Sequence, residues 1–417
     1  MVTQKLKLFF NLFTYMARQL LKIFNGRIIT PDRIIEDGVI VVNENTIAQI
    51  SEDDIELENV IEINAHGNYI SPGFIDIHVH GGGGYDFMDG TETAFLKIAN
   101  THARFGTTSM VPTTLTSDKE NLLHVLKIYE EANKNNTAGA QFLGMHLEGP
   151  YFSLSQIGAH DTRYIRNPDP SEYIEILSKS NAIVRWSAAP ELEGAIDFGR
   201  YLRSKGVIAA VAHTDAIYED IVEAFANGYS LITHLYSAMS GVTRRSAFRY
   251  AGVIESAYVI DDLDVEIIAD GIHLPAPLLK LVYKIKGANR IALITDAMRA
   301  AGMPPGESVL GNLQTGIKVV VEDGVAKLPD RTSFAGSVAT ADRLVRSMIN
   351  MADVSLMDAI KMMTSTPARI MGISERKGSL VEGKDADIII FDDNIDIKMT
   401  IINGTLVYEK TNDTNSD

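Results

Sequence analysis

Eight short apolar runs follow one another along the middle of the chain, and nearly every one of them ends in His, Glu or Asp. They are FIDIHVH (74–80), TTSMVPT (107–113), QFLGMHLEG (141–149), IVRWSAAPE (183–191), VIAAVAH (207–213), LITHLY (231–236), VEIIADGIH (265–273) and IALITDA (291–297). The stretches between them carry apolar residues every three or four positions, which is the period of a helix. Strands that are apolar on both faces are typical of parallel sheets covered by helices. The pattern therefore predicts an α/β fold, with either a (β/α)₈ barrel or an open doubly wound sheet.

The position of the polar residues distinguishes these two folds. In a TIM-type barrel, active sites lie at the C-terminal ends of the strands, which is where these His, Glu and Asp residues occur. The pattern therefore favours the (β/α)₈ barrel. A longer stretch follows the eighth run, and within it KVVVEDGVAKL predicts a hairpin that turns at Asp323-Gly324.

The two ends of the chain have a different sequence pattern from the middle. Short β-type runs with turn signals fill residues 20–71, and similar runs with an Asn403-Gly404 turn return over residues 376–417. We therefore predict one small β-sandwich domain built from both ends of the chain. The (β/α)₈ barrel domain is expected over residues 72–375.

Residues 1–19 are expected to be an N-terminal extension. Two lysines and a short apolar run resemble a secretory signal, but Asn11 and Thr14 interrupt the run and no small-residue cleavage site follows. A mis-assigned start before Met16, or a frayed extension, is the interpretation that we favour over export. No other segment reaches the ~18–20 apolar residues of a membrane span, so we expect a cytoplasmic protein without a membrane partner.

The charge of the chain limits its partners. With 54 acidic and 38 basic side chains the formal net charge is −16, which repels nucleic acid and anionic lipid. We therefore expect no nucleic-acid partner. The chain has no cysteine, so any bound metal ion must be held by His, Asp or Glu.

A metal site is the strongest functional inference from the residues alone. The His78-Val79-His80 segment ends the first run, and strand alternation places both imidazoles on one face, where they can bind one ion. Glu148, His213, His234 and Asp296 occupy equivalent strand-end positions in other runs. Imidazole and carboxylate ligands suit Zn²⁺ or Fe²⁺ better than Mg²⁺. The alternative is that these are separate polar residues at the mouth of a barrel.

Of the ten histidines, six lie at or just after strand ends, namely His78, His80, His160, His213, His234 and His273. The other four, His66, His102, His124 and His146, are interpreted as structural or exposed. His146 shares a strand face with Glu148, and we expect it to be a packed, hydrogen-bonded core residue.

Two further segments have features of phosphate sites. The glycines of residues 81–84 lack the Lys-Ser/Thr of a P-loop, so we expect a flexible loop beside the metal. Arg244, Arg245 and Arg249 lie within six residues of one another at the active-site end of the barrel. A guanidinium gives two-point recognition of phosphate, which favours an anchor over a merely solvated face.

The segments PGFIDIHVHG, HLEGP, AHTDA, THLYSAM, ADGIH and TDAM occur in the order found in the amidohydrolase superfamily. HLEGP, followed by His160 twelve residues after Glu148, resembles the N-acetylglucosamine-6-phosphate deacetylases. The resemblance extends from about Leu20 to the end of the chain. It implies hydrolysis of the acetamido group of N-acetyl-D-glucosamine 6-phosphate, in amino-sugar catabolism, and a homodimer.

The resemblance also implies roles for individual residues. Glu148, His213 and His234 match the main metal ligands, and Asp296 matches the catalytic acid/base. His160 matches a residue near the scissile amide, and His273 matches one that contacts the sugar phosphate. The family's usual Asn is replaced by Ser237, beside Ala238 in the substrate-binding motif, and a common Arg-Glu-Pro-Gly pattern is replaced by RRSAFRYAG. Arg245 is therefore our prediction for the phosphate anchor, with Arg244 and Arg249 as alternatives.

The residue types fit this chemistry independently of the resemblance. Asp296 can accept a proton from water and deliver it to the leaving nitrogen, and His160 can donate toward the oxyanion. No G-x-S-x-G elbow is present to supply a serine nucleophile. Because His78 and His80 are present, we predict two ions, one on these histidines and Glu148, with Asp296 as a possible further ligand, and one on Glu148, His213 and His234. The alternative is a single ion.

Three other functions stay open from the sequence. The substrate could be N-acetylgalactosamine 6-phosphate, the galactosamine epimer. The protein could be another metal-dependent hydrolase of the superfamily, such as a cyclic amidase. It could also be a barrel that has lost catalysis and serves as a binding protein.

Overall fold

The computed structural model describes residues 20–411. The predicted N-terminal extension, residues 1–19, lies outside the described residues, as do residues 412–417. No helix among the described residues is both long enough and apolar enough to cross a membrane. The division of the chain into domains at the residue boundaries given above stays a prediction.

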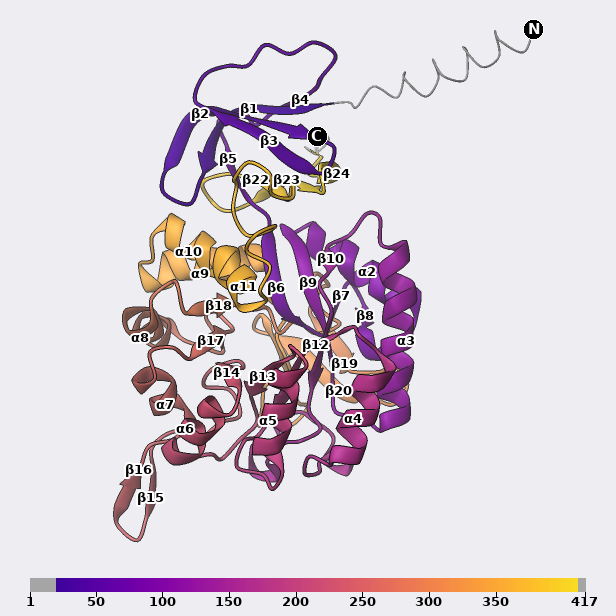
Figure 1. The fold of residues 1–417 in the computed structure, drawn as a ribbon, viewed down its shortest axis with the longest axis vertical. Helices are drawn as coiled ribbons and strands as arrows, with labels where there is room; N and C mark the ends of the chain where they lie inside the picture. The colour runs from indigo at the N-terminus through magenta and orange to yellow at the C-terminus, as the bar shows by residue number, and fades with distance from the viewer. Residues whose placement is uncertain (1–19, 412–417) are drawn as a thin grey trace, which may run out of the picture.

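Eight parallel strands form a ring in the central part of the chain (Figure 1). They are β6 (Phe74–Val79), β9 (Thr107–Thr114), β11 (Met145–Glu148), β12 (Ile183–Ala188), β13 (Ile208–Val211), β14 (Tyr229–Ile232), β17 (Asp264–Ile267) and β18 (Ile291–Leu293). The two-residue strand β10 (Gln141–Phe142) also pairs with β9. Each strand falls on or beside one of the eight apolar runs.

The ring closes between its first and last strands. Val79, at the end of β6, forms a parallel bridge with Ala297, and the backbone N–H of Asp296 donates to the carbonyl of His78 at 2.9 Å. An open doubly wound sheet would leave these two edges apart. The prediction of a (β/α)₈ barrel is therefore confirmed.

Helices follow the strands and cover the ring. They are α2 (Glu92–Ala103), α3 (Lys119–Asn135), α4 (Pro170–Lys179), α5 (Ala195–Ser204), α6 (Tyr218–Ala226), α7 (Val253–Val259), α8 (Ala276–Lys286), α9 (Ala341–Ala352), α10 (Leu356–Met363) and α11 (Ser365–Ile370). Short 3₁₀ turns span Phe87–Asp89, Leu154–Gln156 and Thr162–Tyr164.

Local sequence explains where several helices begin and which face they bury. The side chains of Thr91, Asp118 and Asp169 accept hydrogen bonds from backbone N–H groups in the first turns of α2, α3 and α4. Helix α9 buries Leu344 and Met348, which are four residues apart and so lie on one face.

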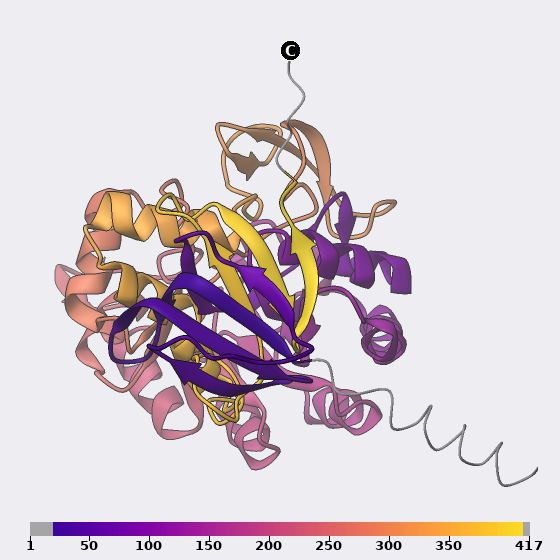
Figure 2. The same ribbon diagram turned by 90° about the horizontal axis from the view of Figure 1, so that it is seen from above.

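Both ends of the chain contribute to one separate sheet, in which the indigo and yellow strands of Figure 2 lie side by side. Its strands are β1 (Leu21–Ile29), β2 (Ile34–Asn43), β3 (Thr46–Ser51), β4 (Ile61–Asn64), β5 (Tyr69–Pro72), β22 (Ile388–Phe391), β23 (Ile397–Ile402) and β24 (Thr405–Glu409). The antiparallel pairing of β5 with β22 joins the two ends. The strands form one branched sheet, because β1 pairs with both β4 and β5.

The small sheet lies where the barrel strands begin, away from their C-terminal ends. Only Gly73 separates β5 from β6, so the chain passes directly from this sheet into the first barrel strand. Apolar side chains from both ends, among them Ile23, Ile40 and Ile388, share one buried cluster. The predicted small β domain from both chain ends is thus present as a sheet with its own core.

Three smaller sheets lie in the connections. They are β7–β8 (Gly81–Gly82, Tyr85–Asp86), β15–β16 (Thr243–Arg245, Phe248–Tyr250) and β19–β20–β21 (Gly306–Leu310, Ile317–Glu322, Val325–Lys327). The predicted turns at Asp323-Gly324 and Asn403-Gly404 are confirmed, and all four residues have positive φ, between 48° and 76°. This conformation at both positions is typical of tight hairpins with Gly at the second position.

Candidate metal centre

Five strand ends meet at one end of the barrel and carry the predicted ligands. His78 lies on β6 and His80 just beyond it, and Glu148 is the last residue of β11. His213, His234 and Asp296 lie two or three residues past the ends of β13, β14 and β18. Because parallel strands of a closed barrel end on the same rim, these six side chains come together although 218 positions separate His78 from Asp296.

The backbone leaves the barrel sharply at three of these positions. His213, His234 and Asp296 have φ angles of 48°, 31° and 47°. Residues other than glycine rarely adopt this left-handed region, and such residues concentrate at functional sites, where the surrounding structure must stabilise them. Here the carbonyls of His213 and His234 accept hydrogen bonds from Ser153 and Ser237, respectively, both at 2.9 Å.

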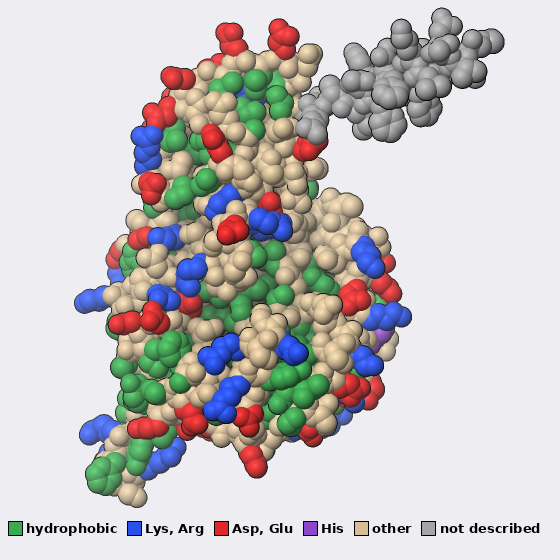
Figure 3. Space-filling model, in the orientation of Figure 1, with side chains coloured by type: hydrophobic (Ala, Val, Ile, Leu, Met, Phe, Trp, Pro, Cys, Tyr) green, Lys and Arg blue, Asp and Glu red, His purple; other side chains and the backbone are tan. Residues whose placement is uncertain are grey.

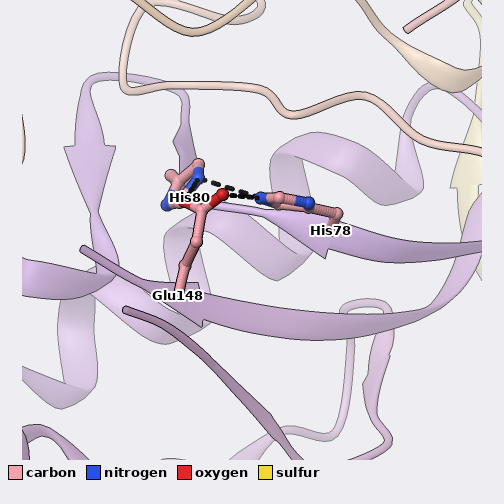
Figure 4. A group of neighbouring side chains, drawn as sticks. All are labelled: His78, His80 and Glu148. Carbon is pink, nitrogen blue, oxygen red and sulfur yellow. Dashed lines mark hydrogen bonds and ion pairs between the residues drawn. The ribbon is translucent and has the colours of Figure 1, made fainter. Parts of the chain in front are cut away.

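The buried carboxylate of Glu148 is the centre of the cluster. Its Oε1 lies 3.1 Å from the Nε2 of His234, 3.6 Å from that of His213 and 3.5 Å from that of His78. Its Oε2 lies 3.2 Å from the Nε2 of His80 and 3.6 Å from that of His160. Figure 4 shows the first-strand pair and Glu148 pointing toward one another. Every imidazole thus turns the same nitrogen toward one carboxylate.

The imidazole nitrogens also face one another. The Nε2 atoms of His78 and His80 are 3.2 Å apart, and those of His160 and His213 are 3.3 Å apart. Such nitrogen pairs satisfy each other poorly, whereas a cation between them would accept both lone pairs. One ligand atom each from His78, His80 and Glu148 lie within 4.8 Å of one another, and so do those from Glu148, His160 and His213. The residues therefore fit a divalent ion, and Glu148 belongs to both groups.

Two of the imidazoles are oriented by contacts at Nδ1, the ring nitrogen that faces away from Glu148. The Nδ1 of His213 lies 2.8 Å from the carbonyl of Gln156, and the Nδ1 of His78 lies 3.4 Å from the carboxylate of Glu266. A partner that accepts from Nδ1–H leaves Nε2 free to bind a metal. In the described part of the chain, the buried Nδ1 atoms of His80, His160 and His234 have no hydrogen-bond partner.

The ionisation of the cluster is strongly perturbed. Burial alone would lower the pKa of His78 and His80, but the nearby carboxylates of Glu148 and Asp296 raise them to about 9 and about 10. Burial would raise the pKa of both carboxyl groups, but His78, His213 and His234 lower that of Glu148, and His78 and His80 lower that of Asp296, below the usual range. Burial, followed by the neighbouring His213, lowers the pKa of His160 to about 3.

Asp296 is also positioned through the residue before it, Thr295, by a contact that the sequence did not predict. The wholly buried Asp76 on β6 accepts a hydrogen bond from the hydroxyl of Thr295 at 2.5 Å, and burial raises its pKa to about 7. This contact ties the residue before Asp296 to the first strand. A carboxyl group between two isoleucines of a buried strand was the signal available in the sequence.

A cavity of about 440 Å³ opens above the cluster. Of the predicted site residues it is lined by His80, Glu148, His160, His213, His234, Ser237, Ala238, His273 and Asp296. His78 lies behind this surface and is wholly buried. The cavity wall also contains Tyr236, Leu115, Leu310 and Phe334, for which the sequence predicted no role.

Substrate-facing residues are held in place by their neighbours. The Nδ1 of His273 lies 2.8 Å from Asp270, and its ring centroid lies 4.7 Å from that of Phe334. His160 comes from the loop after β11, and this loop also supplies Gln156, the partner of His213. The loop therefore positions both a cavity residue and a ligand.

Arg244, Arg245 and Arg249 are not brought to this cavity. They lie on the β15–β16 hairpin, which projects from the barrel in Figure 1. All three side chains are exposed, and Arg245 stacks over the ring of Tyr250 at 5.2 Å. Within one chain, none of them lines the cavity beside the cluster.

The four remaining histidines have structural surroundings. His146 is buried and its ring nitrogens lie near the hydroxyls of Ser187 (2.7 Å) and Thr113 (3.3 Å). His102 and His124 lie near the backbone carbonyls of glycines at 2.9 and 3.1 Å, and His66 is exposed in a turn.

The glycines of residues 81–84 form a tight hairpin, β7–β8, instead of a loose loop. Gly83 and Gly84 donate to Ala301 and Arg299 at 2.8 and 2.9 Å, so the hairpin is tied to the segment after the eighth strand. A Cβ at Gly81 would meet the carbonyl of Tyr85 at 2.4 Å, which explains the glycine there.

Comparison with known proteins places this arrangement in a family. The sequence profile of the Amidohydrolase family matches residues 69–407, which include the whole barrel. The chain belongs to the amidohydrolase family. This family is metal-dependent, in agreement with the His and Glu cluster.

Individual relatives show which group of amidohydrolases this chain resembles. An N-acetylglucosamine-6-phosphate deacetylase of Bacillus subtilis is 33% identical over 94% of this chain and 98% of its own. An N-acetylgalactosamine-6-phosphate deacetylase of Escherichia coli O157:H7 is also 33% identical, over 89% of this chain and 93% of its own. The crystal structure of N-acetylglucosamine-6-phosphate deacetylase from Pasteurella multocida superposes with a TM-score of 0.86 at 28% identity, covering 93% and 99% of the two chains. The predicted resemblance to this group of amidohydrolases is confirmed.

The raised pKa values of His78 and His80 lead to a testable pH dependence. Both imidazoles carry an extra proton below about pH 9 when no ion is bound, and a metal ion binds only the neutral form. Metal binding at pH 7.5 should therefore release protons, and affinity at this group should fall as the pH falls. Calorimetric titration in two buffers of different ionisation enthalpy measures the release. If the observed binding enthalpy is the same in both buffers, no proton is released, and this result would contradict the protonated pair.

Proposed function

We propose that this amidohydrolase hydrolyses the acetamido group of N-acetyl-D-glucosamine 6-phosphate, giving D-glucosamine 6-phosphate and acetate, as a step of amino-sugar catabolism in the cytoplasm. The observation that carries the proposal is the buried Glu148 carboxylate surrounded by five imidazole Nε2 atoms beneath a cavity. The relatives that carry this activity in their names support the choice of substrate.

Two divalent ions, Zn²⁺ or Fe²⁺, would share Glu148. His78 and His80 would hold the first, with Asp296 near enough to join them, since its Oδ1 lies 3.1 Å from the Nε2 of His80. His213 and His234 would hold the second. Two groups of ligand atoms share Glu148, one with His78 and His80 and one with His160 and His213, and they support this number. His234 is preferred to His160 as the ligand because its Nε2 lies closer to Glu148, at 3.1 Å against 3.6 Å. A bound ion would act as a Lewis acid toward the amide oxygen and would lower the pKa of water.

Asp296 would be the general base and then the general acid. Its lowered pKa keeps the carboxylate ionised at neutral pH, so it can accept the proton of the attacking water. As the carbon–nitrogen bond breaks, Asp296 returns this proton to the nitrogen, because an amine leaves poorly unless it is protonated. Its position at the cavity wall supports both transfers.

His160 would stabilise the negative charge that develops on the amide oxygen. With its pKa lowered to about 3 the imidazole is neutral, so it acts as a hydrogen-bond donor without giving up its proton. Ser237, Ala238 and His273 line the same cavity and would contact the sugar and its phosphate.

The phosphate anchor would come from a second copy of this chain. Arg245 does not line its own cavity, and the hairpin that carries it ends in exposed arginines and in Phe248, which is 71% exposed. Figure 3 shows blue and green side chains together on this projection at the lower left. We therefore propose a homodimer in which the hairpin reaches the partner's cavity. The projection suits this role because no lysine or arginine of the described residues lines the cavity, and a guanidinium would add two-point recognition of the phosphate to the contact from His273.

The galactosamine epimer is the second candidate substrate. The E. coli relative named for it is as similar as the B. subtilis relative named for the glucosamine compound, with 33% identity each. Ser237 in place of the usual Asn lies in the substrate cavity, where the epimers must be distinguished.

Acetate release from the two 6-phosphate epimers by metal-reconstituted protein tests the function. We expect faster release from the glucosamine compound, and an Asp296→Asn variant that keeps its fold and metal but loses turnover by about a thousandfold, because the amide cannot transfer the proton. Absence of acetate from both epimers would refute the proposal. Near-normal turnover in Asp296→Asn would remove this residue from the mechanism.

The Arg245→Ala variant tests the phosphate anchor. We expect its KM for the 6-phosphate to rise about tenfold or more, with little change for the unphosphorylated sugar, because a charge-assisted bidentate contact is lost. Steady-state kinetics on both substrates gives the comparison, with Arg163→Ala, another exposed arginine, as the control. An equal loss on both substrates, or full activity in a monomer at low concentration, would contradict the anchor from a second chain.

A further inference from the structure

A wholly buried ion pair crosses the barrel directly behind the metal centre. Arg185 on β12 and Glu266 on β17 both have no exposed surface. Arg185 donates to both carboxylate oxygens of Glu266, through Nη1 to Oε1 and through Nη2 to Oε2 at 2.9 Å. The strands β12 and β17 are not neighbours in the ring, so the two side chains meet across its interior.

The pair is connected to the first barrel strand. Arg185 also donates to the carbonyl of Ile77, the residue before His78, at 3.2 Å. The second carboxylate oxygen of Glu266 lies 3.4 Å from the Nδ1 of His78. One ion pair therefore contacts both the backbone beside His78 and its ring.

The remaining contacts of His78 leave its ring little freedom. The ring of His146 packs edge-on against it, with centroids 4.7 Å apart and an interplanar angle of 90°. His146 is fixed in turn by Ser187, whose hydroxyl lies 3.1 Å from that of Thr233, and Thr233 accepts from Arg185 at 2.7 Å. The ring of His78 is thus enclosed by a continuous buried hydrogen-bond network.

Stability alone gives no strong reason for such a pair. Desolvation of two charges is costly, and a buried ion pair can often be replaced by apolar residues without loss of stability. The Nε of Arg185 moreover has no hydrogen-bond partner, so the pair is incompletely satisfied. The contact of the ion pair with His78 indicates a role in positioning this ring.

We propose that Glu266, held by Arg185, is a positioning residue for His78. It accepts the hydrogen of Nδ1 and so keeps Nε2 turned toward Glu148, which sets the affinity of the ion at His78 and His80. A carboxylate behind a metal-binding imidazole typically contributes tenfold to a hundredfold in affinity. The inference rests on the proposed function only in that it takes this histidine pair to bind an ion.

The test compares variants that differ in what faces His78. Arg185→Leu/Glu266→Leu removes both charges and the acceptor, whereas Arg185→Leu/Glu266→Gln removes the charges but returns a neutral acceptor. Zn²⁺ number and affinity are measured by chelator competition, and thermal unfolding is followed in the same samples. His78→Gln/His80→Asn serves as the reference for loss of the ion at this pair.

We expect the Leu/Leu variant to bind the ion of the reference site about tenfold to a hundredfold more weakly, with the second ion retained. The Leu/Gln variant should regain most of this affinity. Lys377→Leu/Asp387→Leu is the matched control, because it removes another buried ion pair, only 4% and 7% exposed, at the small sheet. This control should bind both ions as the unmodified protein does.

Unchanged Zn²⁺ affinity in the Leu/Leu variant would overturn the inference, and so would an equal loss in the Lys377/Asp387 control. If the Leu/Leu variant does not fold, Arg185→Met/Glu266→Met decides, because it also removes the acceptor that faces His78, and an affinity equal to that of the unmodified protein would overturn the inference. If His78→Gln/His80→Asn loses no ion, the histidine pair binds none and the inference is wrong. Acetate release by the unmodified protein would still support the proposed function in that case. The expected affinities without acetate release would instead refute the proposed function alone.

Discussion

The carboxylate of Glu148 is the interaction on which the rest of the site depends. It is almost wholly buried and lies within 3.6 Å of five imidazole nitrogens from four different segments. A carboxylate buried in this way requires positive partners, either protonated histidines or a cation. The same requirement explains why the pKa values of His78 and His80 are raised while that of Glu148 is lowered.

The barrel makes this convergence possible, and the sequence predicted it to a large extent. Apolar runs that end in polar residues indicate parallel strands with chemistry at one rim, and the bridge between Val79 and Ala297 confirms that the ring closes. Hairpins at Asp-Gly and Asn-Gly were also predictable, since the turn chemistry is local. The branched form of the small sheet was not, because pairing between β1, β4 and β5 depends on contacts between distant segments.

The pattern at the strand ends predicted the candidate metal ligands, and the family resemblance predicted His160, which lies in the loop after β11. Arg185 and Glu266 escaped notice because their contact joins strands that are not neighbours, and no local pattern encodes which side chains meet across a barrel. Gln156 contributes a backbone carbonyl, which its side-chain identity does not reveal. Arg245 was predicted as a phosphate anchor, but the sequence gives no direction for the hairpin that carries it away from its own cavity.

The metal content and acetate release of a Glu148→Gln variant test the central claim most directly. Glutamine keeps the shape of the side chain but is neutral and cannot share two oxygens between two cations. If Glu148 is the shared ligand, the reconstituted variant should fold normally, lose both ions and release acetate at least about a thousandfold more slowly. Retention of two tightly bound ions with near-normal turnover would contradict the account.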